Sequence, residues 1–424
     1  FALGVFDPSS LIRRAAMSES KGADMTCCSV PDGDDLLWQI LLRLPQQLSS
    51  LPRASAFCKR WRPFATDLMF LRNFYAHHGK PPLLGVFEFR DSMVFTSVLD
   101  TPDHIPRERF DLQRYSCRHE YGTPSGPPHR NEVLCCRQGR VLTIEHVCKE
   151  LIVYTPVTGE QRHMAIPSDF KTFVYHISGA VLCAASNQGH VHGGCHSSPF
   201  KVVLVIMNQQ DDHRPLACVY SSETGSWGKL ISTDIPYLIF TAHRPGSLVG
   251  GALYWLVTTM SCRNDMLKFD LEEQTLAVIN GPPVTDRPLC CQIIQAEAKD
   301  GAVGFSVLSY PRLQMWQGIM NIPGVATWVM WKTIEMNNIL GLPPQIQAGW
   351  RGFETILGYS EDTYAIFIYV DTSVYMVQLK SMQSKRLHKT IYINDYHPLT
   401  GFYSPGITIA GGCDGAEVLH DALG

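Results

Sequence analysis

The sequence predicts an α+β protein of more than one domain, in which a small domain of three helices precedes a large all-β domain. Three observations support this fold class. Helical periodicity is confined to residues 34–78. From residue 81 onward, short β-rich runs alternate with Gly, Pro, Asn and Asp. The chain of 424 residues is also longer than one ordinary hydrophobic core requires.

The first helix is expected in DDLLWQILLRLP, residues 34–45. Its apolar residues follow the i, i+3, i+4, i+7 spacing of one helical face, and they are Leu37, Ile40, Leu41 and Leu44. Asp34 and Asp35 suit the positive end of the helix dipole, and Pro45 is expected to end the helix. Leu36 and Trp38 make the apolar arc wider than a single stripe.

Two more helices are expected before residue 79. In residues 49–67, one narrow face is formed by Leu51, Ala54, Ser55 and Cys58, and Pro63 should end or kink the helix. In residues 67–78, Asp67 is the expected N-cap of a third helix.

The β-rich part contains eleven short runs that are typical of strands. They are residues 81–89, 151–156, 201–209, 216–222, 251–257, 266–271, 304–310, 326–331, 364–370, 374–380 and 390–394. A strand ending in Tyr154, Tyr220 or Phe269 is followed each time by a turn and a new strand, at intervals of 66 and 49 residues. Intervals near 50 favour a β-propeller of about six or seven blades. A pair of β-sandwiches is the alternative.

The domain boundaries follow from this change of pattern. Residues 1–29 are expected to be a flexible tail, 30–78 the helical domain, 79–410 the β domain and 411–424 a loose C-terminal tail. Residues 101–131, which are charged and contain Pro and Gly, are expected to be a long surface loop.

Composition excludes several classes of protein. The formal net charge of −3 favours neither nucleic acid nor an anionic membrane as a partner, and no apolar run is long enough to span a membrane. The chain begins at Phe1 and not at Met, so Met17 or Met25 is the expected start, and no signal peptide is expected. The 14 cysteines include no C-x-x-C pair, and no N-x-S/T site occurs. We therefore expect a cytoplasmic or nuclear protein without a cofactor.

The helical stretches carry a resemblance to a known family. PDGDDLLWQILLRLP, LPRASAFCKRWRPFATD and FLRNFYAHH together resemble an F-box of the type found in large plant families. The matching positions are Pro31, Leu36, Leu37, Ile40, Leu41, Leu44, Pro45, Ala54, Cys58 and Trp61. Val30 stands where Leu is usual, and Gly33 looks like an insertion. The later segments GGALYWLV, MLKFDL and residues 358–386 resemble the F-box-associated, kelch-like β domains of the same proteins.

The resemblance implies a partner and a set of binding residues. In this family a Skp-type adaptor of a cullin-RING ubiquitin ligase interlocks with the F-box. The implied contact residues are Pro31, Leu36, Leu37, Ile40, Leu41, Leu44, Pro45 and Leu51, and the implied core residues are Ala54, Phe57, Cys58 and Trp61. A domain of fewer than about 70 residues rarely buries so many leucines by itself, so a partner is expected on physical grounds as well. Packing of these leucines on the chain's own β domain is the alternative.

Candidate chemistry is sparse. His190, His192, Cys195 and His196 could bind zinc, but no second ligand pair stands out, so no metal site is expected. The acidic pairs Glu272–Glu273 and Glu361–Asp362 lie beside turns, where acidic residues are common, and the basic run Arg53, Lys59, Arg60 and Arg62 is expected to be a solvated face. Trp227, Trp316 and Trp350 could anchor a bound protein, although packing is the expected role.

These patterns favour a non-catalytic adaptor over an enzyme. The F-box would bind the Skp-type subunit, and loops on one face of the β domain would hold an unknown target protein. Two alternatives remain. One is a β-propeller enzyme or carbohydrate-binding protein with an incidental helical N-terminus, and the other is a decayed F-box protein without ligase activity.

Overall fold

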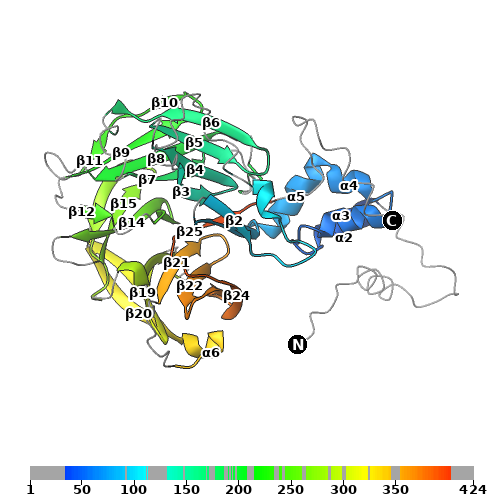
Figure 1. Ribbon diagram of the computed structural model, residues 1–424. Helices are drawn as coiled ribbons and strands as arrows, with labels where there is room; N and C mark the ends of the chain where they lie inside the picture. The colour runs from blue at the N-terminus through cyan, green and yellow to red at the C-terminus, as the bar shows by residue number, and fades with distance from the viewer. Residues whose placement is uncertain are drawn as a thin grey trace, which may run out of the picture. The chain divides into compact units, whose positions relative to one another are not determined.

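The computed structural model describes residues 34–90, 93–110, 112, 131–146, 149–168, 170, 177–185, 190, 192, 194–195, 198–207, 214–233, 238–240, 244–259, 264–284, 288–297, 302–322, 325–344 and 354–402. The chain divides into two compact units, one helical and ending at Gly79, the other spanning Lys80–Phe402 (Figure 1). The sequence had placed the boundary between the helical and β domains one residue earlier, between residues 78 and 79. The predicted tails, 1–29 and 411–424, lie outside the described residues.

The helical unit has four helices among its described residues, one more than predicted. They are α2 (Asp34–Leu42), α3 (Ser50–Phe57), α4 (Arg62–Thr66) and α5 (Leu68–His78). The second predicted stretch is split, because α3 ends at Phe57 and Pro63 lies in the first turn of α4. Proline suits this position, since the N–H groups of a first turn have no partner within the helix. The predicted N-cap of α5 is confirmed: the Asp67 carboxylate accepts a hydrogen bond from the Met69 N–H at 2.7 Å.

The helical unit has a hydrophobic core of its own. The buried residues are Leu37, Leu41, Leu44, Leu51, Ala54, Trp61, Ala65, Phe70, Leu71 and Phe74. Trp38 packs edge-on against Phe70, with ring centroids 5.0 Å apart. Since burying each large apolar side chain contributes about 1.5–3 kcal/mol, this cluster accounts for the association of the four helices.

The β unit contains six antiparallel sheets, which we call blades 1 to 6. Blade 1 contains β1 (Leu83–Phe89), β2 (Met93–Ser97) and β25 (Tyr396–Thr400). Blade 2 contains β3 (Asn131–Arg137), β4 (Arg140–Glu145), β5 (Glu150–Thr155) and β6 (Glu160–Ala165). Blade 3 contains β7 (Ile177–Cys183), β8 (Phe200–Met207), β9 (Pro215–Ser221), β10 (Ser226–Trp227) and β11 (Ile231–Ser232).

The other three blades follow in chain order. Blade 4 contains β12 (Leu238–Phe240), β13 (Ser247–Val249), β14 (Ala252–Thr259), β15 (Asn264–Asp270) and β16 (Thr275–Ile279). Blade 5 contains β17 (Cys291–Gln295), β18 (Val303–Ser309), β19 (Arg312–Ile322) and β20 (Val325–Glu335). Blade 6 contains β21 (Thr355–Ser360), β22 (Ala365–Val370), β23 (Ser373–Gln378) and β24 (Gln383–Lys389). Short helices η1 (Arg107–Phe110), η4 (Pro288–Cys290) and α6 (Met336–Leu340) lie between strands.

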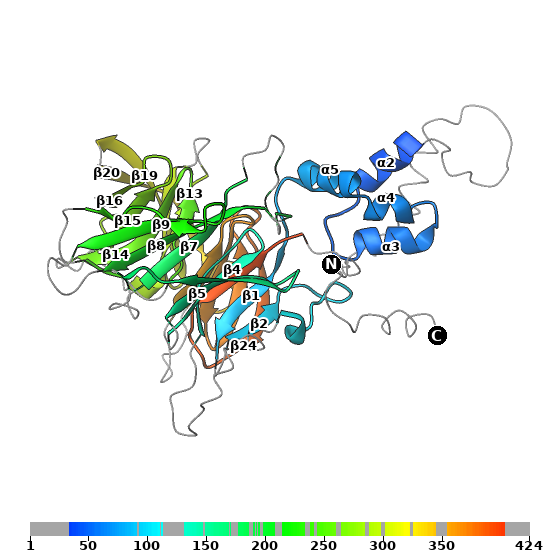
Figure 2. The same ribbon diagram turned by 90° about the horizontal axis from the view of Figure 1, so that it is seen from above.

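The six blades form a closed ring. β3 packs beside both β25 and β7, β8 beside β12, β13 beside β17, β17 beside β21, and β21 beside β25. Figures 1 and 2 show the sheets arranged around a common centre. The predicted β-propeller is therefore confirmed, with six blades, and the sandwich alternative is excluded.

Blade 1 joins the two ends of the β unit. β25 pairs with β1 over a register in which Phe87 faces His397. A β-bulge in β21 brings Gly358 against the Tyr396 carbonyl, where a side chain would clash with the backbone. The ring therefore closes through strands that are about 300 residues apart in the sequence.

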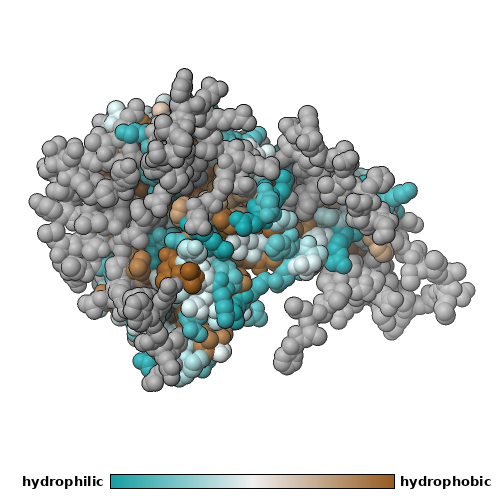
Figure 3. Space-filling view, in the orientation of Figure 1, coloured by the Kyte–Doolittle hydropathy of each residue, from teal (hydrophilic) through white to brown (hydrophobic). Residues whose placement is uncertain are grey.

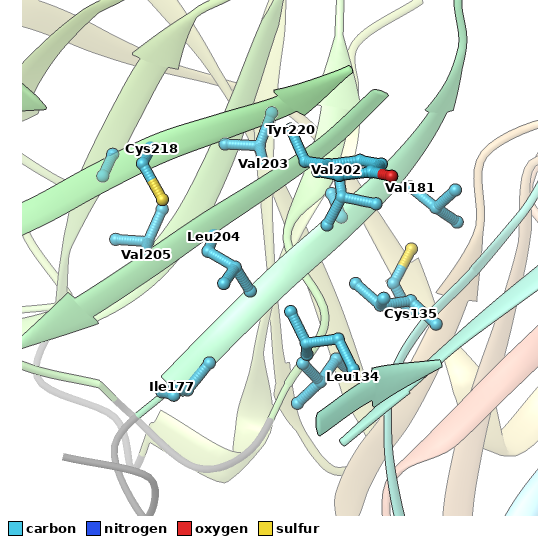
Figure 4. Packing of buried hydrophobic residues seen from close by; sticks show 14 of the residues in the cluster. Leu134, Cys135, Ile177, Val181, Val202, Val203, Leu204, Val205, Cys218 and Tyr220 are labelled. Atoms are coloured by element: carbon cyan, nitrogen blue, oxygen red, sulfur yellow. The ribbon is translucent and has the colours of Figure 1, made fainter. Parts of the chain in front are cut away.

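The largest hydrophobic cluster lies between blades 2, 3 and 4. In Figure 4, side chains of β3, β7, β8 and β9 fill the space between neighbouring sheets, with Leu134 and Cys135 on one side and Val181 and Leu204 on the other. All four are at most 4 % exposed. This packing between blades fixes the positions of the polar residues at the strand ends.

One detail of the predicted β pattern is revised, and another is confirmed. Residues 390–394, predicted as a strand, have no regular structure, and the last strand begins at Tyr396. Tyr154, Tyr220 and Phe269 do occupy equivalent places, in β5, β9 and β15, each of which pairs with the outermost strand of its blade.

Candidate functional site

The helical unit buries half of the predicted partner-binding residues in its own core. Leu37, Leu41, Leu44 and Leu51 are between 0 and 6 % exposed. They do not lie on the surface of this unit, because they share its core with Trp61, which precedes α4, and with Phe70 and Phe74 of α5. Pro31 lies outside the described residues, whereas Ile40 and Pro45 are half-buried.

Other apolar side chains of this unit stay exposed. They are Leu36 at 41 %, Phe57 at 66 %, Leu68 at 72 % and Met69 at 59 %. Phe57 was predicted to be a core residue, and this was wrong, because it is the last residue of α3 and extends past the end of the core. Ala54 and Trp61 are buried in the core, and Cys58 packs at its edge. Leu68 and Met69 were not among the predicted partner-binding residues, since they fall outside the leucine pattern of α2.

Local contacts occur beside each of these exposed side chains. The Phe57 ring lies 5.6 Å from that of buried Trp61. The Arg60 guanidinium donates to the Asp34 carboxylate at 2.8 Å, which connects the start of α2, where Leu36 lies, to the segment after α3. Leu68 and Met69 form the first turn of α5, next to the Asp67 cap. Large apolar side chains fixed on helix ends are suited to docking another protein.

The β unit offers an open groove between blades 4 and 5. Its volume is about 460 Å³, and its walls come from the β13–β14 turn, β15 and β19. Ile319 and Met320 are 46 and 45 % exposed on one wall, and Lys268, Asp270 and Glu272 lie on the other. On the face drawn in Figure 3, hydrophobic residues form small patches among polar ones. An apolar edge beside charged groups is typical of a surface that binds a peptide or protein.

An ion pair connects different blades of the propeller. The Arg137 guanidinium donates to the two Glu361 carboxylate oxygens at 2.7 and 2.9 Å and to the Gly246 carbonyl at 2.8 Å. Asp362 accepts from the Thr400 hydroxyl at 2.6 Å. Both residues of the Glu361–Asp362 pair therefore connect blades, as expected for structural carboxylates. The other acidic pair lies within a single turn of blade 4. There the backbone N–H groups of Glu272 and Glu273 donate to the Asp270 carboxylate.

The candidate aromatic anchors are engaged in packing. The Trp227 indole N–H donates to the Ala165 carbonyl at 3.0 Å, between blades 3 and 2, and its ring lies 5.3 Å from that of Tyr220. Trp316 packs against the core between blades 4 and 5. Trp350 lies outside the described residues.

Three of the four candidate metal ligands come together with a residue that sequence reasoning missed. The ligand atoms of His190, His192 and Cys195 lie within 4.8 Å of one another and of the Cys183 sulfur. The Cys195 thiol lowers the pKa of the Cys183 thiol, which burial opposes. The only sequence signal for Cys183 was a cysteine seven residues before His190, at the end of an apolar run. His196 lies outside the described residues.

Among the described residues, no helix has the length and apolar character needed to cross a lipid bilayer.

Comparison with solved structures finds 285 similar chains. The Dos1 propeller is 10 % identical, with a TM-score of 0.32, and the match covers 63 % of this chain and 62 % of that one. Regucalcin from Agrobacterium tumefaciens is 12 % identical, with a TM-score of 0.35 and coverage of 62 and 75 %. The WD40 domain of SCAP from fission yeast is 12 % identical, with a TM-score of 0.31 and coverage of 66 and 55 %. No curated protein matches the chain.

A family model gives a more specific result. Residues 132–406 match the model described as F-box protein AT5G49610-like, beta-propeller. The matched segment is well over half of the chain and includes blades 2 to 6 and β25. The chain therefore belongs to the family of F-box protein AT5G49610-like β-propellers.

Proposed function

We propose that this protein is a substrate receptor of a ubiquitin ligase of the plant type. In this proposal the helical unit is an F-box that binds a Skp-type adaptor, and through it a cullin-RING ligase. The propeller holds the target protein. The chain would be non-catalytic and would act by raising the effective concentration of a target lysine near the ubiquitin-charged enzyme.

One observation carries the proposal: a propeller of an F-box protein family follows a helical unit that exposes large apolar residues. This unit completes its core with Leu37, Leu41 and Leu44, yet leaves Leu36 and Phe57 exposed. Aromatic and aliphatic anchors of this kind dominate the binding energy of protein interfaces. We therefore assign adaptor binding to the exposed residues Leu36, Phe57, Leu68 and Met69, in place of the buried leucines.

The target-binding role is assigned to the propeller. The groove between blades 4 and 5 is the first place to test, because Ile319 and Met320 are exposed beside charged residues. A reducing compartment, the cytoplasm or the nucleus, suits the described cysteines, since Cys58, Cys136 and Cys183 form no disulfide.

Binding of the full chain to a Skp-type adaptor tests the proposal. Leu36→Asp with Phe57→Asp forms one double variant, and Leu68→Asp with Met69→Asp forms a second. We expect at least one of them to weaken binding by about 100-fold or more, because each lost anchor removes about 2 kcal/mol. Biolayer interferometry measures the dissociation constant, and comparing the two variants shows which helix ends form the interface.

Leu230→Asp is the matched control, since Leu230 is 48 % exposed in the β unit and should leave adaptor binding unchanged. Thermal unfolding of each variant shows that the fold is retained, which is expected because the replaced side chains are outside the core. If the wild-type chain is folded and does not bind the adaptor, the ligase proposal is wrong.

A further inference from the structure

Four potential metal ligands come together at one edge of blade 3. Cys183 is the last residue of β7, and His190, His192 and Cys195 belong to the segment that connects β7 to β8. The Cys183 sulfur lies 3.2 Å from the His190 Nε2 atom. The His190 and His192 rings are 5.1 Å apart and nearly perpendicular, at 75°.

The spacing of the ligand atoms is close to that of a closed zinc site. All four lie within 4.8 Å of one another. In a tetrahedral site with Zn–S bonds of about 2.3 Å and Zn–N bonds of about 2.0 Å, neighbouring ligand atoms are about 3.3–3.8 Å apart. A contraction of roughly 1 Å, within reach of side-chain rotation, therefore completes the site.

Buried polar groups of blade 2 hold the segment in position. Arg140, which is 2 % exposed, donates to the carbonyls of Cys195 and Ser198, both at 2.6 Å. The side-chain oxygen of Gln138 accepts from the Cys183 N–H at 2.6 Å. Both cysteines are thus fixed through their backbones by one turn, between β3 and β4. Such supporting contacts orient the ligands of metal sites.

We propose that Cys183, His190, His192 and Cys195 bind one structural Zn²⁺ ion. Two thiolates and two neutral imidazoles form a ligand set that favours zinc in tetrahedral geometry, and they neutralise its charge. Binding exchanges the thiol protons for the metal, and these protons pass to solvent without any change of oxidation state. With four protein ligands the ion has no open position for substrate, so its role is to fix the β7–β8 segment to blade 2. This inference does not depend on ubiquitin-ligase activity.

Metal analysis of the full chain tests the proposal. The protein is purified under reducing conditions, without chelator and with a tag other than polyhistidine, and then equilibrated with ZnCl₂ and desalted. We expect about one equivalent of zinc per chain by plasma mass spectrometry. The Cys183→Ser, Cys195→Ser double variant should lower this content at least about tenfold.

Control variants separate this site from adventitious binding. Cys136→Ser and His163→Asn replace a cysteine and a histidine of blade 2 that do not belong to the cluster, and both should retain the zinc. Zinc that remains in the Cys183→Ser, Cys195→Ser variant would place the metal elsewhere and overturn the proposal. A wild-type chain that holds no zinc, or that contains a Cys183–Cys195 disulfide by non-reducing peptide mapping, would also overturn it.

A second measurement needs no substitution in the cluster. Co²⁺ added to the metal-free wild-type chain should give the intense visible bands of tetrahedral cobalt and a thiolate-to-cobalt charge-transfer band. Addition of Zn²⁺ should abolish both, whereas Mg²⁺ should not, because it prefers oxygen ligands. The weak spectrum of octahedral cobalt would contradict the proposed site, even if the double variant failed to fold.

Discussion

Buried polar residues fix the centre of the propeller. Arg137 and Glu361 join blades 2 and 6. Arg244, which lies just before β13 of blade 4, donates to the carbonyls of Leu289 and Cys291 at the start of blade 5 and to that of Ile356 in blade 6. Removing one member of such a pair leaves an unpaired charge in a region of low dielectric constant, which costs about 3–5 kcal/mol. These side chains therefore stabilise the ring.

His397 makes stability depend on pH. It lies in β25, is 5 % exposed, and burial lowers its pKa to about 4 against a weaker opposing effect of Glu132. The unfolded chain, in which the pKa is about 6.5, then binds more protons than the folded chain between pH 6.5 and 4. The stabilisation is fully present above pH 6.5, and about 3 kcal/mol is lost as the pH falls to 4.

The His397→Gln variant should show a flatter dependence of unfolding free energy on pH in this window, with little change in slope above pH 7. Urea unfolding at several pH values measures the slope. The exposed residue His163 provides a matched control, and His163→Gln should keep the wild-type slope. Equal slopes for wild type and His397→Gln would show that His397 becomes protonated without unfolding.

At the scale of elements, one turn geometry recurs between the third and fourth strands of the blades. Gly159, Gly225 and Gln274 end these turns in blades 2, 3 and 4, with φ angles of 76°, 67° and 50°. The Gly225 N–H donates to the Ser221 carbonyl at 2.9 Å, and the Gly159 N–H donates to that of Thr155 at 2.8 Å. Positive φ is strained for any residue except glycine, so the turn in blade 4 is less favourable than the glycine turns of blades 2 and 3. Met382, with a φ of 56°, ends the equivalent turn of blade 6 with the same strain.

Reciprocal substitutions test this interpretation. Gly225→Ala should lower the unfolding free energy by about 1 kcal/mol, from backbone strain alone, because an added Cβ would meet nothing within 4 Å. Gln274→Gly should raise it by a smaller amount, since relief of strain is partly offset by the greater freedom of glycine in the unfolded chain. Thermal unfolding measures both, and a stabilising Gly225→Ala change would contradict the assigned geometry.

At the scale of the whole molecule, stability depends on closing the ring. β25 supplies blade 1 with Tyr396 and Leu399, each 1 % exposed, and it packs beside β3 and β21. Without this strand β1 would present an open edge, and blades 2 and 6 would each lose a neighbour. The propeller should therefore unfold as one cooperative unit.

Leu399→Asp tests this dependence. Burying an unpaired carboxylate costs at least several kcal/mol, comparable to the total stability of a domain, so this variant should lose the cooperative unfolding transition of the propeller. Ile391→Asp is the control, because Ile391 is 61 % exposed just before β25 and should change stability by less than about 0.5 kcal/mol. Circular dichroism and limited proteolysis measure both. A cooperative, native-like Leu399→Asp protein would show that ring closure contributes little.

The apolar pattern of α2 shows how far the sequence could predict the candidate site. The pattern located the helix, but half of the residues that the resemblance assigned to partner binding are core residues. Periodicity shows which side chains are expected to be buried, and it cannot show whether they are covered by the chain itself or by another protein. Phe57 shows the converse error, since a large aromatic residue at the end of a helix extends beyond the core.

By itself, the sequence determined the order of a helical part and a β part, the Asp67 cap and the propeller class, because periodicity, caps and turn spacing are local properties of the chain. The tertiary structure alone decided that there are six blades, that β25 joins β1, and that Cys183 meets His190, His192 and Cys195. These arrangements depend on contacts between segments far apart in the chain or across a connection, whose distances are set by the packing of the blades and not by sequence spacing.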